Sequence, residues 1–284
     1  MLGQKIALVI GASRGIGAGV ARELASQGAH VILAARTLDG AHTPTFGENG
    51  PPLPGSLLEH VEVILSKGGQ AEPYAVDLLD REAIHEMLES IASRHGRLDI
   101  LVNCAMGLPA QYKGEIWNSD DTEWRAMMDV GVRGKYLAIH HASKIMRSQG
   151  SGLIVNISAG AAHMEYYSPV FRIAMAAVDR MTKAVAFDLR DDNVACVSIW
   201  PRWVRTEWVL MAAQDASLGI AVSQEDLAES DSPEFTGRAI AYLAADPKIL
   251  SRSGEILPVV SLAHDYGFSD IDGSRPALHS PRQN

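Results

Sequence analysis

The 284-residue chain has only two cysteines, no long apolar run and no excess of positive charge, and each shortage excludes a class of protein. Cys104 and Cys196 stand alone, so neither a disulfide framework nor a cysteine metal site is predicted. No apolar stretch reaches the roughly 18 residues of a membrane helix, and the N-terminus runs into a strand pattern without a signal sequence. The formal net charge of −9 argues against a nucleic-acid surface. We therefore expect a cytoplasmic protein with a small-molecule substrate and neither a membrane nor a nucleic-acid partner.

Short apolar runs alternate along the chain with longer amphipathic stretches. The runs read as strands at 5–10, 30–35, 71–76, 98–103, 152–157, 194–200 and 254–260. The amphipathic stretches read as helices at 15–27, 57–67, 81–95, 122–147 and 168–191. Strands that are apolar almost throughout are typical of a parallel sheet covered on both faces. The pattern predicts one α/β domain over 1–284, a Rossmann-type, doubly wound, seven-stranded parallel sheet with helices on both faces.

Three segments interrupt this rhythm. Residues 37–56 are rich in glycine and proline and predict a loop insertion after the second strand. Residues 206–235 follow the sixth strand, where loops border the ligand crevice of such sheets, so we expect a substrate lid there. Residues 264–284 read as a C-terminal extension packed on the surface.

The sequence GASRGIG lies between the first strand and the first helix. Its glycines allow a sharp turn and let a pyrophosphate approach the helix N-terminus, where free N–H groups favour anions. Because this pattern lies after a strand and before a helix, it indicates a dinucleotide site. The predicted contacts are Gly11, Ser13, Arg14, Gly15, Ile16 and Gly17.

The end of the second strand indicates which dinucleotide is bound. An NAD site usually has an acid there for the ribose 2′-hydroxyl, but this chain has Ala35 followed by Arg36. Arg36 and Arg14 suit a 2′-phosphate, so the predicted cofactor is NADP. Asp77, with Leu78 beside it, ends the third strand and is placed to bond the adenine; the alternative for Asp77 is a plain helix cap.

Four motifs together resemble the short-chain dehydrogenase/reductase superfamily. They are GASRGIG, Val76–Asp77, LVNCA at 101–105 and PRWVRTE at 201–207, and the resemblance extends from residue 4 to residue 260. The segments LAADPKILSRSGEILP and YGFSDIDG resemble the subgroup typified by dehydrogenase/reductase member 1. The resemblance implies a Rossmann-type fold, NADP, and a homodimer or homotetramer built through the long helices on either side of the fifth strand. It also implies that Asn103 and Ala105 lie beside the cofactor and that Val204 and Thr206 lie near the nicotinamide amide.

The chain departs from this family at the residues that carry its chemistry. The family uses a Tyr-x-x-x-Lys pair on one helix, a Ser from the preceding loop and an Asn from an earlier helix. The alignment puts Phe171 at the Tyr and Met175 at the Lys, and Gly131 at the Asn. The Ser position falls on Ala159 or, one residue earlier, on Ser158.

Other residues are candidates for proton donation and substrate binding. Tyr167 precedes Phe171 by four residues, on a loop that also carries His163 and Tyr166, and it is the candidate proton donor. Arg202 stands after Pro201, where the family usually has glycine, and could bind an anionic substrate group or polarise a carbonyl.

The sequence supports three functions. The first is an NADP(H)-binding oxidoreductase that acts on a carbonyl or alcohol with non-standard or weak catalysis. The second is an isomerase, cyclase or lyase that uses the same pocket. The third is a non-catalytic NADP-binding partner or sensor. The intact cofactor motif favours the first and the third.

Overall fold

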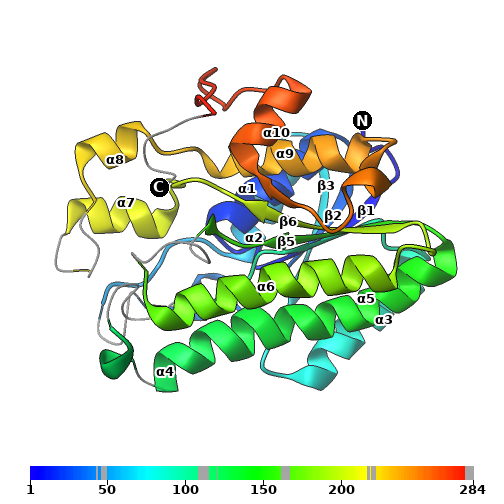
Figure 1. Ribbon diagram of the computed structural model, residues 1–284, viewed down its shortest axis with the longest axis horizontal. Coiled ribbons are helices and arrows are strands. Elements are labelled where there is room, and N and C mark those ends of the chain that lie inside the picture. Colours follow the sequence, from blue (N-terminus) through cyan, green and yellow to red (C-terminus); the bar gives the residue numbers. More distant parts are fainter. Residues whose placement is uncertain are drawn as a thin grey trace.

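The computed structural model of the chain describes residues 1–42, 44–45, 50–107, 115–119, 121–160, 167–215, 218 and 222–278. A twisted sheet lies between two layers of helices (Figure 1). Within the described ranges, no helix is both long enough and apolar enough to cross a membrane.

Seven strands in the described part of the chain form one parallel sheet, as the sequence predicts. They are β1 (Ile6–Ile10), β2 (His30–Ala35), β3 (Gln70–Ala75), β4 (Ile100–Asn103), β5 (Gly152–Ile157), β6 (Val194–Trp200) and β7 (Ile256–Pro258). Their order is β3-β2-β1-β4-β5-β6-β7, and all neighbours are parallel. β1 and β4 are buried along their whole length, whereas β3 forms an edge, where its Pro73 is tolerated. The strand order reverses between β1 and β4, and ligands bind at such a point.

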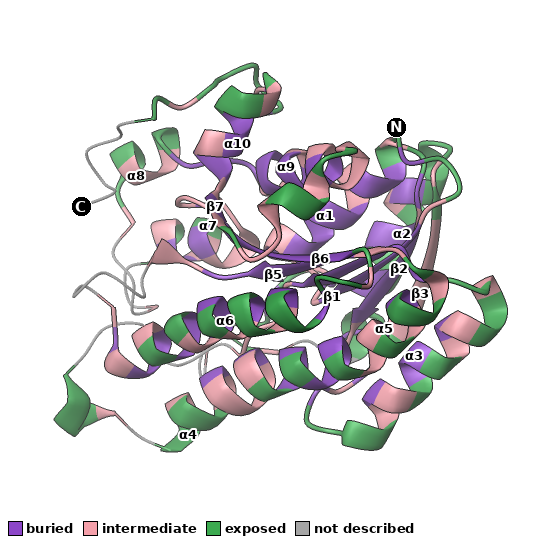
Figure 2. Ribbon diagram, turned by 45° about the vertical axis from the view of Figure 1, so that its right-hand side comes forward, coloured by how far each residue is buried: buried purple, intermediate pink, exposed green. Residues whose placement is uncertain are grey.

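Helices cover both faces of the sheet, and each presents its buried side to the strands (Figure 2). One face is covered by α1 (Gly15–Ser26), α2 (Leu57–Ser66), α9 (Pro233–Ala245) and α10 (Val259–Tyr266). The other face is covered by α3 (Arg81–His95), α5 (Lys135–Gln149) and α6 (Pro169–Asp188). Side-chain caps begin several of these helices: Ser56 caps α2, Asp80 caps α3, Ser168 caps α6 and Ser232 caps α9.

The predicted helix at 122–147 is not uniform. It consists of α4 (Asp121–Trp124), a π-helical segment (Arg125–Gly134) and α5. A π-helix has a wider turn than an α-helix and often occurs at functional sites. Here it lies beside α6, on the side of the molecule to which the predicted active site belongs.

Two of the three interrupting segments contain some regular structure. The predicted loop at 37–56 holds a short 3₁₀ turn (Gly40–His42) and a bridge between Thr45 and Pro52, and its residues 43 and 46–49 lie outside the described residues. The segment 206–235 contains α7 (Glu207–Gln214), α8 (Gln224–Ala228) and the start of α9. Residues 216–217 and 219–221 of this segment also lie outside the described residues. The C-terminal extension continues past α10 and is described to residue 278.

Candidate functional site

The glycine loop between β1 and α1 forms a cradle of bare backbone. Gly11 has φ of +91°, and a Cβ there would lie 2.6 Å from the Ala105 nitrogen. A Cβ on Gly17 would lie 2.1 Å from the Gly11 carbonyl oxygen. Contacts this close to backbone exclude every side chain, so both positions require glycine. The surface they leave at the sheet's switch point fits a dinucleotide pyrophosphate, as the sequence predicts.

The other predicted residues of this loop hold it in place. Ser13 is buried, and its Oγ accepts a hydrogen bond from Arg14 Nη1 at 3.2 Å. Ile16 packs against the core on the α1 face of the sheet and is only partly buried, and its contact with the cofactor stays a prediction.

The N-terminus of α1 carries an unexpected acid. Arg14 is the N-cap residue and makes no side-chain cap bond, so the first turn offers N–H groups to an anion. The Glu207 carboxylate, from the first residue of α7, accepts a hydrogen bond from the Gly15 N–H at 2.7 Å. The segment predicted to be a lid therefore places a negative charge at the end of the helix where the cofactor phosphates are expected.

Two arginines mark the ribose end of the crevice. Arg14 donates to the carbonyl oxygens of Pro54 and Gly55 at 3.0 and 2.7 Å, and so ties the 37–56 segment to the glycine loop. Burial lowers the pKa of the Arg14 guanidinium, the charge of Glu207 opposes this, and the charge of Arg36 adds to it. Arg36 follows the last residue of β2, and its side chain is exposed.

Asp77 and Leu78 follow β3. The Asp77 carboxylate accepts a hydrogen bond from the Leu79 N–H at 3.0 Å, within its own turn. The cap of α3 is Asp80, whose Oδ1 accepts from Glu82 N and Ala83 N, so the alternative that Asp77 caps this helix is wrong. Leu78 is buried, and its Cβ lies 2.9 Å from the place where a Cβ on Gly134 would stand.

Asn103 and Ala105 lie at the end of β4, against the glycine loop. Asn103 Nδ2 donates to Asn156 Oδ1 at 2.9 Å, so its side chain points along the sheet toward β5 rather than outward. The backbone oxygens of Asn103 and Ala105 both accept from Lys135 Nζ, at 3.0 and 2.9 Å. Lys135 is 2% exposed, and burial lowers the pKa of its ammonium to about 8. A buried cation thus lies directly behind two predicted cofactor contacts.

The segment after β6 closes the crevice from the opposite side. Thr206 is the N-cap of α7, and its Cγ2 lies 3.3 Å from the place where a Cβ on Gly15 would stand. Val204 is buried and forms a parallel bridge with Asp231. Thr206 therefore lies against the glycine loop, and its contact with the nicotinamide stays a prediction.

Phe171 and Met175 lie on the first two turns of α6, inside a third apolar cluster that we call the lid cluster. They are 6% and 3% exposed. The cluster joins α6, the π-helical segment and α7: its buried members are Leu53, Met127, Val170, Phe171, Ala174, Met175 and Ala212, and it is bordered by Met106, Met128, Val132, Ala159, Tyr167, Trp203, Trp208, Met211, Leu218 and Val222. The first turns of α6 therefore face an apolar environment rich in methionine and tryptophan.

Ser158 and Ala159 differ in what they face. Ser158 is buried, and its Oγ donates to the Met175 carbonyl oxygen at 3.3 Å. Ala159 is partly buried and borders the lid cluster. This placement favours Ala159 as the residue that faces the pocket, because the Ser158 hydroxyl is bonded to the α6 backbone.

Tyr167 and Gly131 lie on either side of the first turns of α6. The Tyr167 ring is 5.2 Å from the Phe171 ring, centroid to centroid. Gly131 is buried in the π-helical segment, with Met106 Cγ 3.7 Å from the place of a Cβ. His163 and Tyr166 lie outside the described residues.

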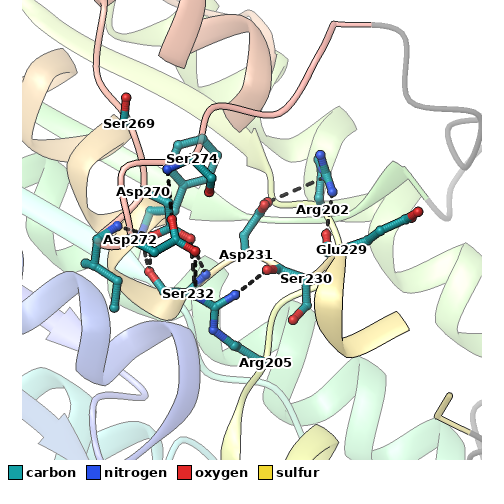
Figure 3. Close-up of polar contacts among 12 residues, drawn as sticks. Arg202, Arg205, Glu229, Ser230, Asp231, Ser232, Ser269, Asp270, Asp272 and Ser274 are labelled. Atoms are coloured by element: carbon teal, nitrogen blue, oxygen red, sulfur yellow. Dashed lines mark hydrogen bonds and ion pairs between the residues drawn. The ribbon is translucent and has the colours of Figure 1, made fainter. Parts of the chain in front are cut away.

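Arg202 is held at the base of the lid (Figure 3). Its Nη2 donates to the Glu229 carbonyl oxygen at 2.5 Å, and its Nε lies 3.7 Å from Asp231 Oδ2. Burial raises the pKa of the Asp231 carboxyl to about 6, although Arg202 opposes the shift. The substrate contact expected of Arg202 stays a prediction.

A second arginine joins the lid to the C-terminal extension. Arg205 donates to the Ser230 carbonyl oxygen, and its Nη2 lies 3.6 Å from Asp270 Oδ2 (Figure 3). Asp270 is 2% exposed and accepts hydrogen bonds from both the backbone N–H and the hydroxyl of Ser232. The extension thus fixes the start of α9, and with it one end of the lid.

Comparison with known proteins places this geometry in a family. Residues 54–259 match the family model described as enoyl-(acyl carrier protein) reductase, and residues 5–46 match the short chain dehydrogenase model. The chain is 33% identical over 282 residues to mouse dehydrogenase/reductase SDR family member 1, covering 96% of this chain and 85% of that protein. The chain belongs to the short-chain dehydrogenase/reductase family.

A further relative agrees with the assignment, and a solved structure agrees with the fold. 2,3-Dihydro-2,3-dihydroxybenzoate dehydrogenase of Bacillus subtilis is 32% identical over 216 residues, covering 75% of this chain and 76% of that protein. The crystal structure of L-sorbose reductase from Gluconobacter frateurii, complexed with NADPH and L-sorbose, is similar in fold, with a TM-score of 0.75 and 24% identity over 90% of this chain and 95% of that chain.

Sequence reasoning missed two charged residues of this short-chain dehydrogenase/reductase. Lys135 had a signal, because it lies three residues before Ala138 and seven before Ala142 on the buried face of a predicted helix. No feature of the sequence distinguishes Glu207, since acidic residues are common in the first turn of a helix. Only the fold brings Glu207 to a loop 192 residues away.

Proposed function

We propose that this protein is an NADP(H)-dependent oxidoreductase of the short-chain dehydrogenase/reductase family that acts on a carbonyl or alcohol without the family's Tyr–Lys pair. The observation that carries the proposal is the contrast between the cofactor part of the site and the part that would transfer the proton. The glycine cradle leaves bare backbone for a ligand, Arg14 ties the 37–56 segment to it, and Thr206 lies against Gly15, all of which support cofactor binding. The positions of the proton donor and its partner hold a phenyl ring and a thioether within an apolar cluster.

The choice of NADP rests on charge. Arg14 lies in the glycine loop and Arg36 follows the end of β2, where an NAD site would have an acid, and guanidinium groups bind phosphate oxygens in pairs. These guanidiniums suit the extra phosphate of NADP, which carries more negative charge than NAD.

Proton transfer needs a new route. A bound nicotinamide supplies the hydride, and the alkoxide oxygen left on the substrate must then receive a proton. Phe171 has no exchangeable proton, and Met175 has no charge that could tune a neighbour. Tyr167 is the candidate donor, because its ring packs against Phe171 at the mouth of the lid cluster. Its phenolate would then be reprotonated from solvent.

Cofactor choice is tested by titrating the protein separately with NADPH and NADH and following nucleotide fluorescence. NADPH is expected to bind more tightly. Arg36→Asp should weaken NADPH binding by about tenfold and leave NADH nearly unchanged, since it replaces a phosphate partner by a like charge. Arg190→Asp, the same charge change at the far end of α6, is the control. Equal affinity for the two nucleotides in the wild type would refute the choice of NADP.

The missing proton pair is tested by restoring it. Wild-type protein should reduce a panel of simple aldehydes and ketones poorly although it binds NADPH. Phe171→Tyr with Met175→Lys should raise these rates, because an ammonium beside a phenol lowers the phenol pKa and lets it protonate an alkoxide. Either change alone should do little. Wild-type rates equal to those of ordinary family members would overturn our reading of α6.

Tyr167→Phe separates the remaining possibilities. If Tyr167 is the donor, this variant keeps NADPH affinity and loses the native reaction. A protein that binds NADPH but transfers no hydride to any carbonyl would instead be a non-catalytic NADP-binding partner or sensor, or an isomerase, cyclase or lyase that uses the same pocket.

A further inference from the structure

A cluster of two histidines and a glutamate lies at the edge of the sheet, on elements that do not form the glycine cradle. His30 is the first residue of β2, Glu72 lies in β3, and His95 is the last residue of α3. One ligand atom from each of the three lies within 4.8 Å of the others. Each residue is half-buried and belongs to a different regular element, so the backbone holds the three side chains in a defined arrangement.

The contacts within the cluster leave ligand positions for an ion. His95 Nε2 lies 2.9 Å from Glu72 Oε1, and the rings of His30 and His95 are 4.9 Å apart. Arg94 Nη1 donates to the other carboxylate oxygen, Oε2, at 2.9 Å. His30 Nε2 is buried and has no hydrogen-bond partner within the described residues. A buried ring nitrogen without a partner is costly, and coordination to a metal ion is one way to satisfy it.

We propose that His30, Glu72 and His95 bind a Zn²⁺-class transition metal ion, with water completing a tetrahedral shell. Two imidazole nitrogens and one carboxylate oxygen are a donor set that zinc accepts. Metal–ligand bonds of about 2.0–2.2 Å place tetrahedral donor atoms about 3.4 Å apart. The His95 and Glu72 atoms, now 2.9 Å apart, would therefore separate, and the His30 nitrogen, within 4.8 Å of both, would adjust by side-chain rotation. Arg94, on the outer carboxylate oxygen, orients Glu72 from the second shell.

A bound ion would link three elements of the fold, β2, β3 and α3. Because the site exists only in the folded chain, binding stabilises the fold by mass action. The proposal does not depend on the nucleotide or on any turnover, so it stands or falls separately from the proposed function.

The test uses the full chain after treatment with a chelator. Zn²⁺ titrated by calorimetry should bind at one site and raise the unfolding temperature, whereas Mg²⁺ should do neither. Co²⁺ should give the visible absorption of a four-coordinate nitrogen–oxygen site. His30→Ala and the isosteric Glu72→Gln should each abolish the Zn²⁺ effects, and His264→Ala, at an exposed histidine outside the cluster, should keep them.

Two results would overturn the proposal. One is the absence of saturable Zn²⁺ binding to wild-type protein that unfolds cooperatively. The other is Zn²⁺ binding that survives Glu72→Gln but is lost in His141→Ala, because the rings of His85 and His141 also lie close together, at 4.7 Å.

Discussion

Replacing Glu207 by glutamine is expected to tighten NADPH binding. The Glu207 carboxylate accepts a hydrogen bond from the Gly15 N–H at the N-terminus of α1, where the positive end of the helix would otherwise attract a phosphate. Any dinucleotide that places its phosphates there must displace this carboxylate or lie next to it. Both outcomes oppose binding, so the acid acts against the cofactor from within the lid.

The magnitude follows from the contact that is lost. A hydrogen bond to a charged group contributes about 1.5–3 kcal/mol, and a neutral one about 0.5–1.5 kcal/mol. Glutamine keeps the shape and a neutral acceptor, so Glu207→Gln should recover a difference of roughly 1–1.5 kcal/mol. At about 1.4 kcal/mol per factor of ten, this is a gain of about five- to twelvefold in NADPH affinity. Glu207→Ala removes the acceptor altogether and should gain somewhat more.

The assay is a fluorescence titration with NADPH at low and high salt. Glu225→Gln, the same change at an exposed position on α8, is the control for the overall loss of one negative charge in the lid. It should leave affinity nearly unchanged. Unchanged or weaker NADPH binding by Glu207→Gln, in a wild type that binds NADPH measurably, would show that the carboxylate does not compete with the phosphates.

Three other predictions concern the frame of the site. The folded-state pKa of Lys135 is about 8 and lies below its unfolded value. The free energy of unfolding of the wild type should therefore rise between about pH 8 and 10.5, by an amount on the order of 3 kcal/mol. Chemical denaturation at several pH values should show this rise in the wild type and not in Lys135→Met. Asp270→Ala should lower the free energy of unfolding by roughly 2–4 kcal/mol, because it removes the buried carboxylate that accepts from the Ser232 N–H and hydroxyl and lies beside Arg205. A loss below 0.5 kcal/mol in urea denaturation would contradict this. Gly17→Ala should abolish NADPH binding in the fluorescence titration, since its Cβ would meet the Gly11 oxygen at 2.1 Å, and retained affinity would refute the backbone cradle.

The fold could be predicted from local pattern. A parallel strand buried on both faces must be apolar along its length, and β1 and β4 are, so periodicity alone separated strands from helices. The glycine loop was equally legible, because its residues lie within seven positions and act through their own backbone. The positions of Phe171 and Met175 followed from their spacing on one helix, and their shared burial agrees with it.

Tertiary structure decided what these elements do to one another. It placed Glu207 on the glycine loop, turned Arg202 toward Glu229 and Asp231, and buried Lys135 behind Asn103. None of these pairings is a property of a short stretch of chain. Local sequence determines which backbone conformation is low in free energy, and burial determines which side chains must be apolar. The partner of a charge, however, depends on which distant segment the packing brings within hydrogen-bond reach.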